Sequence, residues 1–301
     1  MKKDIPFTKT VAAGNDFLIV DARRLRQRRT LPWKAVSRAL CDRHQGIGAD
    51  GLLVLESSAA ADVKMQVFNP DGSEAQMCGN GARCVALYLA QRRRGKGRDA
   101  IVLQTRAGRV SAEVRDGRVA MRLMDPTDLR LNLSLDVERR HLQMGFINTG
   151  VPHVVVPVAD LETVDVNRLG RAIRYHGAFS PRGTNVNFVQ PDPDHTNRLR
   201  VRTYERGVEG ETLSCGTGVA AAALVYALNR SLESGRETTG GNGRGSQLWT
   251  LQVQPRSGDI LTVSFAIAPD RRGLRAAHVS LEGTAVRVFE GTVCWPLKRH
   301  P

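Results

Sequence analysis

Apolar and polar residues alternate along several stretches of this chain, which is the pattern of half-buried β-strands. In the clearest case, apolar residues recur at every second position from Val110 to Val114 and again from Val119 to Leu123. The dipeptide Asp116-Gly117 between them tolerates the positive φ angles of a type I′ turn, so the segment predicts a β-hairpin. The same alternation returns at Leu261–Phe265, Val279–Leu281 and Val286–Val288.

Helical periodicity is confined to four segments, residues 33–43, 83–92, 166–174 and 219–230. Isolated helices among hairpins, without a regular alternation of strand and helix, predict an α+β fold. Residues 234–246 are rich in Gly, Ser, Thr and Arg and lack core-forming side chains, so we expect a mobile loop there.

A repeated unit is the most informative feature of the sequence. In the first half, an alternating strand at Val63–Val67 leads through a turn and an acidic residue to Cys78-Gly79-Asn80-Gly81 and an apolar helix. In the second half, an alternating strand at Leu199–Thr203 leads in the same way to Cys215-Gly216-Thr217-Gly218 and a second apolar helix. The duplication predicts one site to which each half contributes a cysteine.

Cys-Gly-x-Gly at the start of a helix is suited to acid–base chemistry. The first N–H groups of a helix lack intrahelical partners and carry the positive end of its dipole, which lowers the pKa of a thiol placed there. Glycines destabilise a helix by about 1 kcal/mol each relative to alanine. We interpret them as giving a ligand carboxylate close access to the backbone N–H groups. Two such thiols, acting from opposite sides of one carbon, would invert its configuration by removing and returning a proton.

Less specific interpretations apply to the other candidates. Cys41, Cys84 and Cys294 are expected to be small packing residues. Cys78 and Cys84 lie too far apart in sequence for the usual zinc spacing, so no metal is expected. A disulfide bond between cysteines is kept as an alternative, although a reducing compartment disfavours it. His153, just before an apolar run, is equally compatible with a strand-end histidine and with one that assists a thiol.

Length and composition limit the class of protein. At 301 residues, two lobes are expected, and the 41% hydrophobic content supports real cores. The N-terminus has no signal-peptide core, and the longest apolar run is too short to span a membrane, so we expect a cytoplasmic protein. The net charge of +14 leaves a nucleic-acid-binding protein as a minority alternative. The basic clusters lack interleaved aromatic residues, which favours a solvated arginine-rich surface.

One further motif is interpreted negatively. Residues 46–51, Gly-Ile-Gly-Ala-Asp-Gly, match a dinucleotide-binding fingerprint by letters alone. They follow Arg43-His44-Gln45 instead of an apolar strand, and no helical pattern comes after them, so no nucleotide cofactor is predicted.

Several motifs, in order and over nearly the whole length, resemble those of the diaminopimelate epimerase family. They begin with Phe7-Thr8-Lys9 and Gly14-Asn15-Asp16-Phe17 and end with Gly283-Thr284-Ala285 and Val288-Phe289-Glu290-Gly291. Between them lie residues 46–52, 69–74, 78–83, 152–153, 183–188, 204–207 and 215–218. The resemblance is specific because it rests on many linked motifs.

The resemblance implies two pseudo-symmetric lobes, each a curved, mostly antiparallel sheet around a central helix, with an active site between them. The first lobe would comprise residues 1–124, completed by 284–301, and the second residues 125–283. Family members are cofactor-independent isomerases that interconvert LL- and meso-2,6-diaminopimelate, a step of lysine biosynthesis. The resemblance also suggests a homodimer.

The family pattern also implies residue roles. Cys78 and Cys215 would be the two acid–base thiols, with His153 assisting one and Glu205 the other. Backbone N–H groups would hold the reacting carboxylate, and side chains would hold the rest of the substrate. The backbone groups are those of Gly79, Asn80, Gly216 and Thr217, and the side chains are those of Asn15, Asn69, Asn185, Glu205 and Arg206.

The chain departs from the family pattern at three positions. Val151 stands where many members have a substrate-contacting asparagine, Gly51 where some have a glutamine, and Ala12 replaces a common glycine. The nearest alternative is a proline racemase or hydroxyproline epimerase of the same fold, which also uses two cysteines. Those relatives usually have a histidine in the place of Asn80, and a monocarboxylate substrate would leave Glu205-Arg206 without a purpose.

Overall fold

The computed structural model describes residues 3–25, 31–93, 99–233, 246–270 and 273–297. The chain forms two compact units, Met1–Met121 with Gly283–Pro301, and Arg122–Glu282. The expected loop at 234–246 lies, except for Ser246, outside the described residues. In the part of the chain that the structure describes, no helix combines the length and apolarity needed to cross a membrane.

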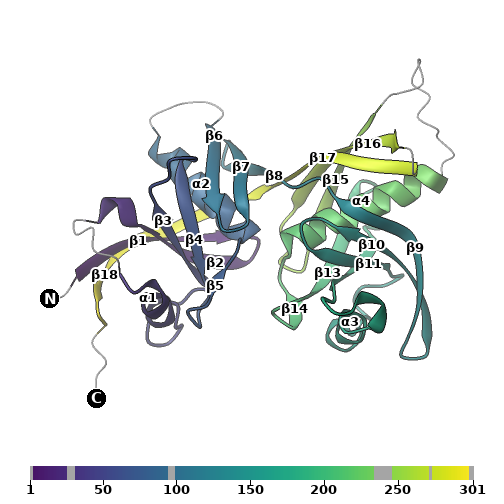
Figure 1. Cartoon of the computed structure of the whole chain (residues 1–301), viewed down its shortest axis with the longest axis horizontal. Coiled ribbons are helices and arrows are strands. Elements are labelled where there is room, and N and C mark those ends of the chain that lie inside the picture. The colour runs from purple at the N-terminus through teal and green to yellow at the C-terminus, as the bar shows by residue number, and fades with distance from the viewer. Residues whose placement is uncertain (1–2, 26–30, 94–98, 234–245, 271–272, 298–301) are drawn as a thin grey trace. The chain divides into compact units, whose positions relative to one another are not determined.

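The first unit is built on one mixed sheet (Figure 1). Its strands are β1 (Lys3–Ala12), β2 (Asn15–Asp21), β3 (Gly51–Glu56), β4 (Val63–Phe68), β6 (Asp99–Thr105), β7 (Gly108–Arg115), β8 (Arg118–Arg122) and β18 (Val286–Trp295). The strand order is β18–β1–β2–β3–β4–β6–β7–β8, and only β2–β3 and β4–β6 are parallel among these pairs. The short strand β5 (Glu74–Ala75) pairs with the end of β4.

A central helix, α2 (Gly79–Arg92), fills the core of the first unit. Its residues from Asn80 to Ala90 are all buried, and they pack against apolar side chains of β2, β3, β4, β6 and β7. The opposite face of β2 and β3 packs against α1 (Trp33–Leu40). Both faces of β3 are therefore covered, which explains why its sequence is a continuous apolar run without alternation.

The second unit repeats this design. Its strands are β9 (Thr127–Val137), β10 (Arg140–Asn148), β11 (Pro152–Pro157), β12 (Asn185–Pro191), β13 (Arg198–Glu205), β15 (Gln247–Pro255), β16 (Leu261–Asp270) and β17 (Gly273–Thr284). They are paired in that order, and only β11–β12 and β13–β15 are parallel. The short strand β14 (Gly210–Thr212) pairs with β13, while α3 (Val166–Arg174) packs against β12 and β13.

The two units match strand by strand. Among the residues described, each has eight strands aligned in the same order, with parallel pairs between the third and fourth strands and between the fifth and sixth. In each, a short strand pairs with the fifth strand and a central helix follows it in the chain. In the second unit that helix is α4 (Gly216–Glu233), buried along most of its length. The repeat predicted from the two Cys-Gly-x-Gly segments thus extends to the topology of both units.

The predicted elements are confirmed with shifted ends. The hairpin at Asp116-Gly117 is present as β7 and β8, and both turn residues have positive φ, 50° and 76°. The α+β class is confirmed. Helices α2 and α4 begin earlier than the apolar pattern suggested, because they include the glycines of the two motifs. Helix α1 ends at Leu40 instead of residue 43.

Candidate functional site

The second unit places Cys215 at the start of the central helix. Its carbonyl accepts the first intrahelical hydrogen bond, from Val219 N at 2.8 Å, so Cys215 is the backbone cap of α4. The residue is 8% exposed, and its Sγ lies 3.5 Å from the hydroxyl of Thr217. The thiol therefore sits at the positive end of a long buried helix, with a hydroxyl beside it.

The hydroxyl of Thr217 links this thiol to His153, on β11. His153 Nε2 lies 3.0 Å from Thr217 Oγ1, and its Nδ1 lies 3.1 Å from the amide nitrogen of Asn187. The same amide nitrogen donates to Val154 O, and the Asn187 oxygen accepts from Thr203 Oγ1. An amide nitrogen can only donate, so Nδ1 accepts and the neutral ring carries its proton on Nε2. Thr217 can then accept from His153 and donate to the thiol.

His153 is a neutral group in this site. It is completely buried, and burial, together with the positive charge of Arg206, lowers its pKa to about 3. The histidine thus stays uncharged at neutral pH, which fits the hydrogen-bonding direction given by Asn187. The structure thus places His153 in contact with Thr217, whose hydroxyl lies beside the Cys215 thiol.

Glu205 is the last residue of β13 and Arg206 follows it, next to the buried Asn185. The Asn185 oxygen accepts from the backbone N–H of Arg206 at 2.8 Å, and its amide nitrogen donates to Pro152 O at 3.0 Å. Burial raises the pKa of Glu205, and the nearby hydroxyl of Thr212 acts in the opposite direction. The guanidinium of Arg206 donates to Arg182 O. The second unit therefore carries a carboxyl with a raised pKa at the last residue of β13 and a guanidinium at the next residue.

The first unit places Cys78 in the equivalent position. It caps α2: its carbonyl accepts from Ala82 N at 2.9 Å, and its Sγ accepts from Gly81 N at 3.4 Å. The backbone N–H of Gly81 is one of the helix donors without an intrahelical partner, so it directs positive charge at the sulfur. A negatively charged sulfur is favoured by that contact.

Asn80, two positions after Cys78, also contacts a side chain of the third aligned strand of its unit, Asn15 on β2. The amide nitrogen of Asn80 donates to Asn15 Oδ1 at 2.5 Å, and Arg83 Nη2 donates to Asn80 Oδ1 at 2.7 Å. Thr217 contacts His153 in the same relative place. The predicted residue Asn69 lies farther along the unit, exposed in the turn after β4, where it donates to Ser73 Oγ at 2.9 Å.

The four glycines of the motifs have two different roles, which corrects the expectation that all of them serve ligand access. A Cβ built on Gly79 would meet no described atom within 4 Å, so the start of α2 is open at that residue. A Cβ on Gly81 would lie 3.1 Å from Leu53, and one on Gly218 would clash with Asn187 Oδ1. One on Gly216 would lie 3.2 Å from Leu281. The second glycine of each motif thus lets the helix start pack closely on its sheet.

Comparison with known proteins agrees with this geometry. The profile of the family described as "Diaminopimelate epimerase" matches residues 7–126 and 145–252. A diaminopimelate epimerase from Aquifex aeolicus is 40% identical over 293 residues, covering 95% of this chain and 96% of that protein. One from Methanothrix thermoacetophila is 40% identical over 301 residues, covering 96% of each. The chain belongs to the diaminopimelate epimerase family.

Solved structures with the same fold are more distant in sequence. A PhzF-family phenazine biosynthesis protein from Bacillus anthracis superposes with a TM-score of 0.67 at 19% identity, covering 97% of this chain and 99% of that one. A hydroxyproline epimerase from Agrobacterium vitis gives a TM-score of 0.64 at 17% identity, covering 97% and 93%. These two likenesses establish the fold.

The remaining cysteines divide differently from the expectation. Cys41 and Cys84 are buried packing residues as predicted, and burial raises the pKa of Cys84 to about 12. The prediction for Cys294 was wrong: it is exposed on β18, and its thiol donates to Asp4 Oδ1 at 3.3 Å. In an alternating strand, the sequence does not tell on which face of the sheet a side chain lies, and Cys294 lies on the face that is exposed to solvent.

Several residues of this diaminopimelate epimerase family member escaped the sequence analysis. Asn187 contacts His153, Thr203 donates to Asn187, and Asp50 holds Asn15 at 3.1 Å. Asp50 belongs to the glycine-rich segment that was rejected as a nucleotide site. The strand β3 begins at Gly51, the last residue of that segment, so no helix begins directly after it. These residues could have been found only from the register of the paired strands, because their contacts are with side chains on neighbouring strands.

Gly51, one of the departures from the family pattern, begins β3. A Cβ there would lie 3.1 Å from Phe68 O and 3.3 Å from the Phe17 ring. A side chain at this position would therefore have to displace its neighbours. Within the described ranges, no group of three or more His, Cys, Asp and Glu side chains is placed to hold a metal ion.

Proposed function

We propose that this chain epimerises diaminopimelate, interconverting the LL and meso forms at one α-carbon without a cofactor. The observation that carries the proposal is the duplicated helix start, with Cys78 and Cys215 as caps of topologically equivalent helices. Relatives named diaminopimelate epimerase, at 36–41% identity, indicate the substrate.

In the proposed reaction, the two thiols act as a base and an acid. The thiolate of one cysteine removes the α-proton, the resulting carbanion is protonated on its other face by the second thiol, and the two residues exchange protonation states. The reverse direction uses the same groups in exchanged roles. Proton transfer is balanced, because one proton leaves the carbon and one arrives.

Backbone N–H groups at the two helix starts would hold the reacting carboxylate and stabilise the charge that develops on it. We assign this role to Gly79, Asn80, Gly216 and Thr217. The open space above Gly79 supports it, since a ligand can approach the backbone there. Asn15, Asn69, Asn185, Glu205 and Arg206 would hold the rest of the substrate, where the Arg206 guanidinium suits a distal carboxylate.

Two further groups would adjust the protonation of the thiols. His153 donates toward Thr217, whose hydroxyl lies beside Cys215, so it favours the thiolate of that cysteine. Glu205, with its raised pKa, is the carboxyl that we propose to exchange a proton with a thiol.

The test is solvent-hydrogen exchange. Reduced protein is incubated in D₂O with LL-diaminopimelate, without pyridoxal phosphate or metal, and the amino acid is analysed by NMR and mass spectrometry. We expect deuterium at one α-carbon together with conversion to the meso form. Proline is the control substrate, because relatives of the same fold act on it. Label in proline but not in diaminopimelate would replace this proposal with a proline racemase, and no label in either would refute epimerisation.

We further propose that the protein works as a homodimer in the cytoplasm, where thiols stay reduced. Support for a dimer comes from the family and from β18, which pairs with β1 and exposes Val286, Val288 and Phe289. An exposed apolar row on a strand is typical of an association surface. Light scattering after size-exclusion chromatography measures the mass, and a monomer at micromolar concentration would contradict the dimer.

A further inference from the structure

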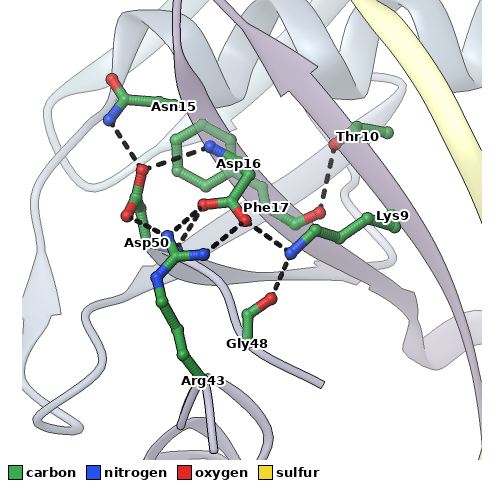
Figure 2. Close-up of polar contacts among 8 residues, drawn as sticks. All are labelled: Lys9, Thr10, Asn15, Asp16, Phe17, Arg43, Gly48 and Asp50. Carbon is green, nitrogen blue, oxygen red and sulfur yellow. Dashed lines mark hydrogen bonds and ion pairs between the residues drawn. The ribbon is translucent and has the colours of Figure 1, made fainter. Parts of the chain in front are cut away.

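A network of charged and amide groups extends from the interior of the first unit to Asn15 (Figure 2). From Asn15 it continues to Asn80. It arises from the register of the sheet. β2 and β3 are parallel, with Phe17 opposite Gly51, so the residues just before this pair, Asp16 and Asp50, are neighbours. The motif around Asn15 and the glycine-rich segment before β3 are thus brought together by a single strand pairing.

Four charged groups hold the base of the network. Asp16 accepts from Lys9 Nζ at 2.6 Å and from Arg43 at 2.7 Å, and Arg43 also donates to Asp50 Oδ1 at 2.7 Å. Lys9 donates in addition to Gly48 O. Burial acts to raise the pKa of Asp16, but the hydrogen bonds and charges of Arg43 and Lys9 outweigh it and hold that pKa well below its usual range. Two positive and two negative charges balance one another there.

The second oxygen of Asp50 faces Asn15. Asp50 Oδ2 accepts from the Asn15 amide nitrogen at 3.1 Å and from the backbone N–H of Asp16 at 3.3 Å. Asp16 in turn accepts the backbone N–H of Asp50 at 3.0 Å. The carboxylate of Asp50 is thereby fixed on both sides, by Arg43 on one oxygen and by Asn15 on the other.

The chain of hydrogen bonds has one direction. A carboxylate paired with arginine only accepts, so the Asn15 nitrogen must face Asp50, and the Asn15 oxygen then faces Asn80. At the other end, a guanidinium only donates, so the Asn80 oxygen must face Arg83. The central bond, from the Asn80 nitrogen to the Asn15 oxygen, is the arrangement that satisfies both ends. Each amide has a second N–H hydrogen that takes no part in these hydrogen bonds.

The second unit contains a counterpart. There, Asn187 on the fourth aligned strand, β12, fixes the orientation of His153 on the third, β11, and His153 contacts Thr217 in the Cys-Gly-x-Gly motif. In the first unit, Asp50 holds Asn15, and Asn15 contacts Asn80 in the equivalent motif. The two units use different residue types for the same purpose, which is to orient the side chain next to the helix start.

From this series of hydrogen bonds we infer that Asp50 is a positioning residue, which sets the orientation of the Asn15 and Asn80 amides for the substrate. The inference rests on the proposed function, in which those two residues bind the substrate. Asp50 does not itself act on the reacting atoms. Its effect on turnover passes through Asn15.

A double-mutant cycle tests the inference. The variants are Asp50→Asn, Asn15→Ala and the double variant, each assayed for kcat and KM by deuterium exchange into diaminopimelate. We expect Asp50→Asn to lower kcat/KM roughly tenfold or more in the otherwise unchanged protein, the size expected for a lost charged hydrogen bond. In the Asn15→Ala background the same change should have almost no further effect, because coupled residues are not additive.

The control is Asp62→Asn, elsewhere in the first unit. Asp62 also accepts from an arginine, Arg93 Nη2 at 2.5 Å, and from a backbone N–H, that of Val102 at 2.6 Å. Loss of a surface ion pair there should leave kcat/KM within twofold in both backgrounds. Circular dichroism melts accompany every variant. If Asp50→Asn does not fold, Asp50→Glu takes its place, since it keeps the charge and displaces the oxygen from Asn15.

The outcomes are distinguishable. Unchanged kcat/KM in the Asp50 variant would overturn the inference, as would an equal loss in both backgrounds, which would indicate a general structural effect. If Asn15→Ala itself had no effect, the proposed substrate role of Asn15 would fail. Absence of exchange in the unchanged protein would instead refute the proposed function.

Discussion

Thr217 is the residue whose removal best tests how the second unit activates its thiol. Its hydroxyl lies 3.5 Å from Cys215 Sγ and 3.0 Å from His153 Nε2, and the tautomer set by Asn187 directs the histidine proton toward Thr217. The hydroxyl hydrogen is then available to the sulfur. Thr217→Val keeps the shape of the side chain and removes this donor, so the cysteine thiolate loses one hydrogen bond.

The expected size follows from the charge of the acceptor. A hydrogen bond to a charged group contributes about 1.5–3 kcal/mol. Each 1.36 kcal/mol corresponds to a factor of ten in a protonation equilibrium, so the thiolate fraction should fall roughly 10- to 100-fold wherever the thiol form predominates. Because His153 is completely buried, its Nε2–H also loses its acceptor, which should cost about 1–3 kcal/mol of folding stability.

The assay is the rate of alkylation by iodoacetamide at fixed pH, resolved by peptide mass spectrometry so that Cys215 is followed separately. The exposed Cys294 serves as the internal reference in the same samples. Thr184→Val is the control, since it also removes a threonine hydroxyl in the second unit, one that donates to Asn185 O and not to a thiol. A Cys215 rate in Thr217→Val within twofold of the unchanged protein would show that the hydroxyl does not support the thiolate.

Three further predictions follow from the site. Cys78→Ala and Cys215→Ala should each reduce epimerisation to background, measured by conversion of LL- to meso-diaminopimelate, and full activity in either would contradict the two-base scheme. His153 has a pKa of about 3 when folded, below its ordinary value of 6.5, so the unfolded state binds the extra proton. Stability should therefore be complete above pH 6.5 and fall by up to about 1.4 kcal/mol per pH unit toward pH 3; urea titrations of His153→Gln should lack that slope. Gly79→Ala should lower kcat/KM without lowering the melting temperature, because its Cβ meets only open space, whereas Gly218→Ala should destabilise the fold by crowding Asn187; the reverse pattern would show that the glycine roles are misassigned.

Local patterns in the sequence were sufficient to predict the four helices and several of the strands. The Asp116-Gly117 turn and the alternation beside it determine a hairpin, because period-2 burial and positive φ are properties of neighbouring residues. The Cys-Gly-x-Gly repeat predicted two equivalent helix starts for the same reason. The exposure of Cys294 could not be inferred locally, since an alternating strand does not indicate which face its sheet covers.

Sequence by itself thus determined the fold class, the duplication and the two cysteines, all of which depend on contacts within short segments. Tertiary structure decided what surrounds them. Asp50 lies beside Asn15, and Asn187 beside His153, only because strands distant in the chain pair in one register. Hydrogen-bond direction, and the neutral state of the buried His153, likewise depend on those partners. Such groups have no local signature, because their chemistry is set by neighbours that the chain brings together only on folding.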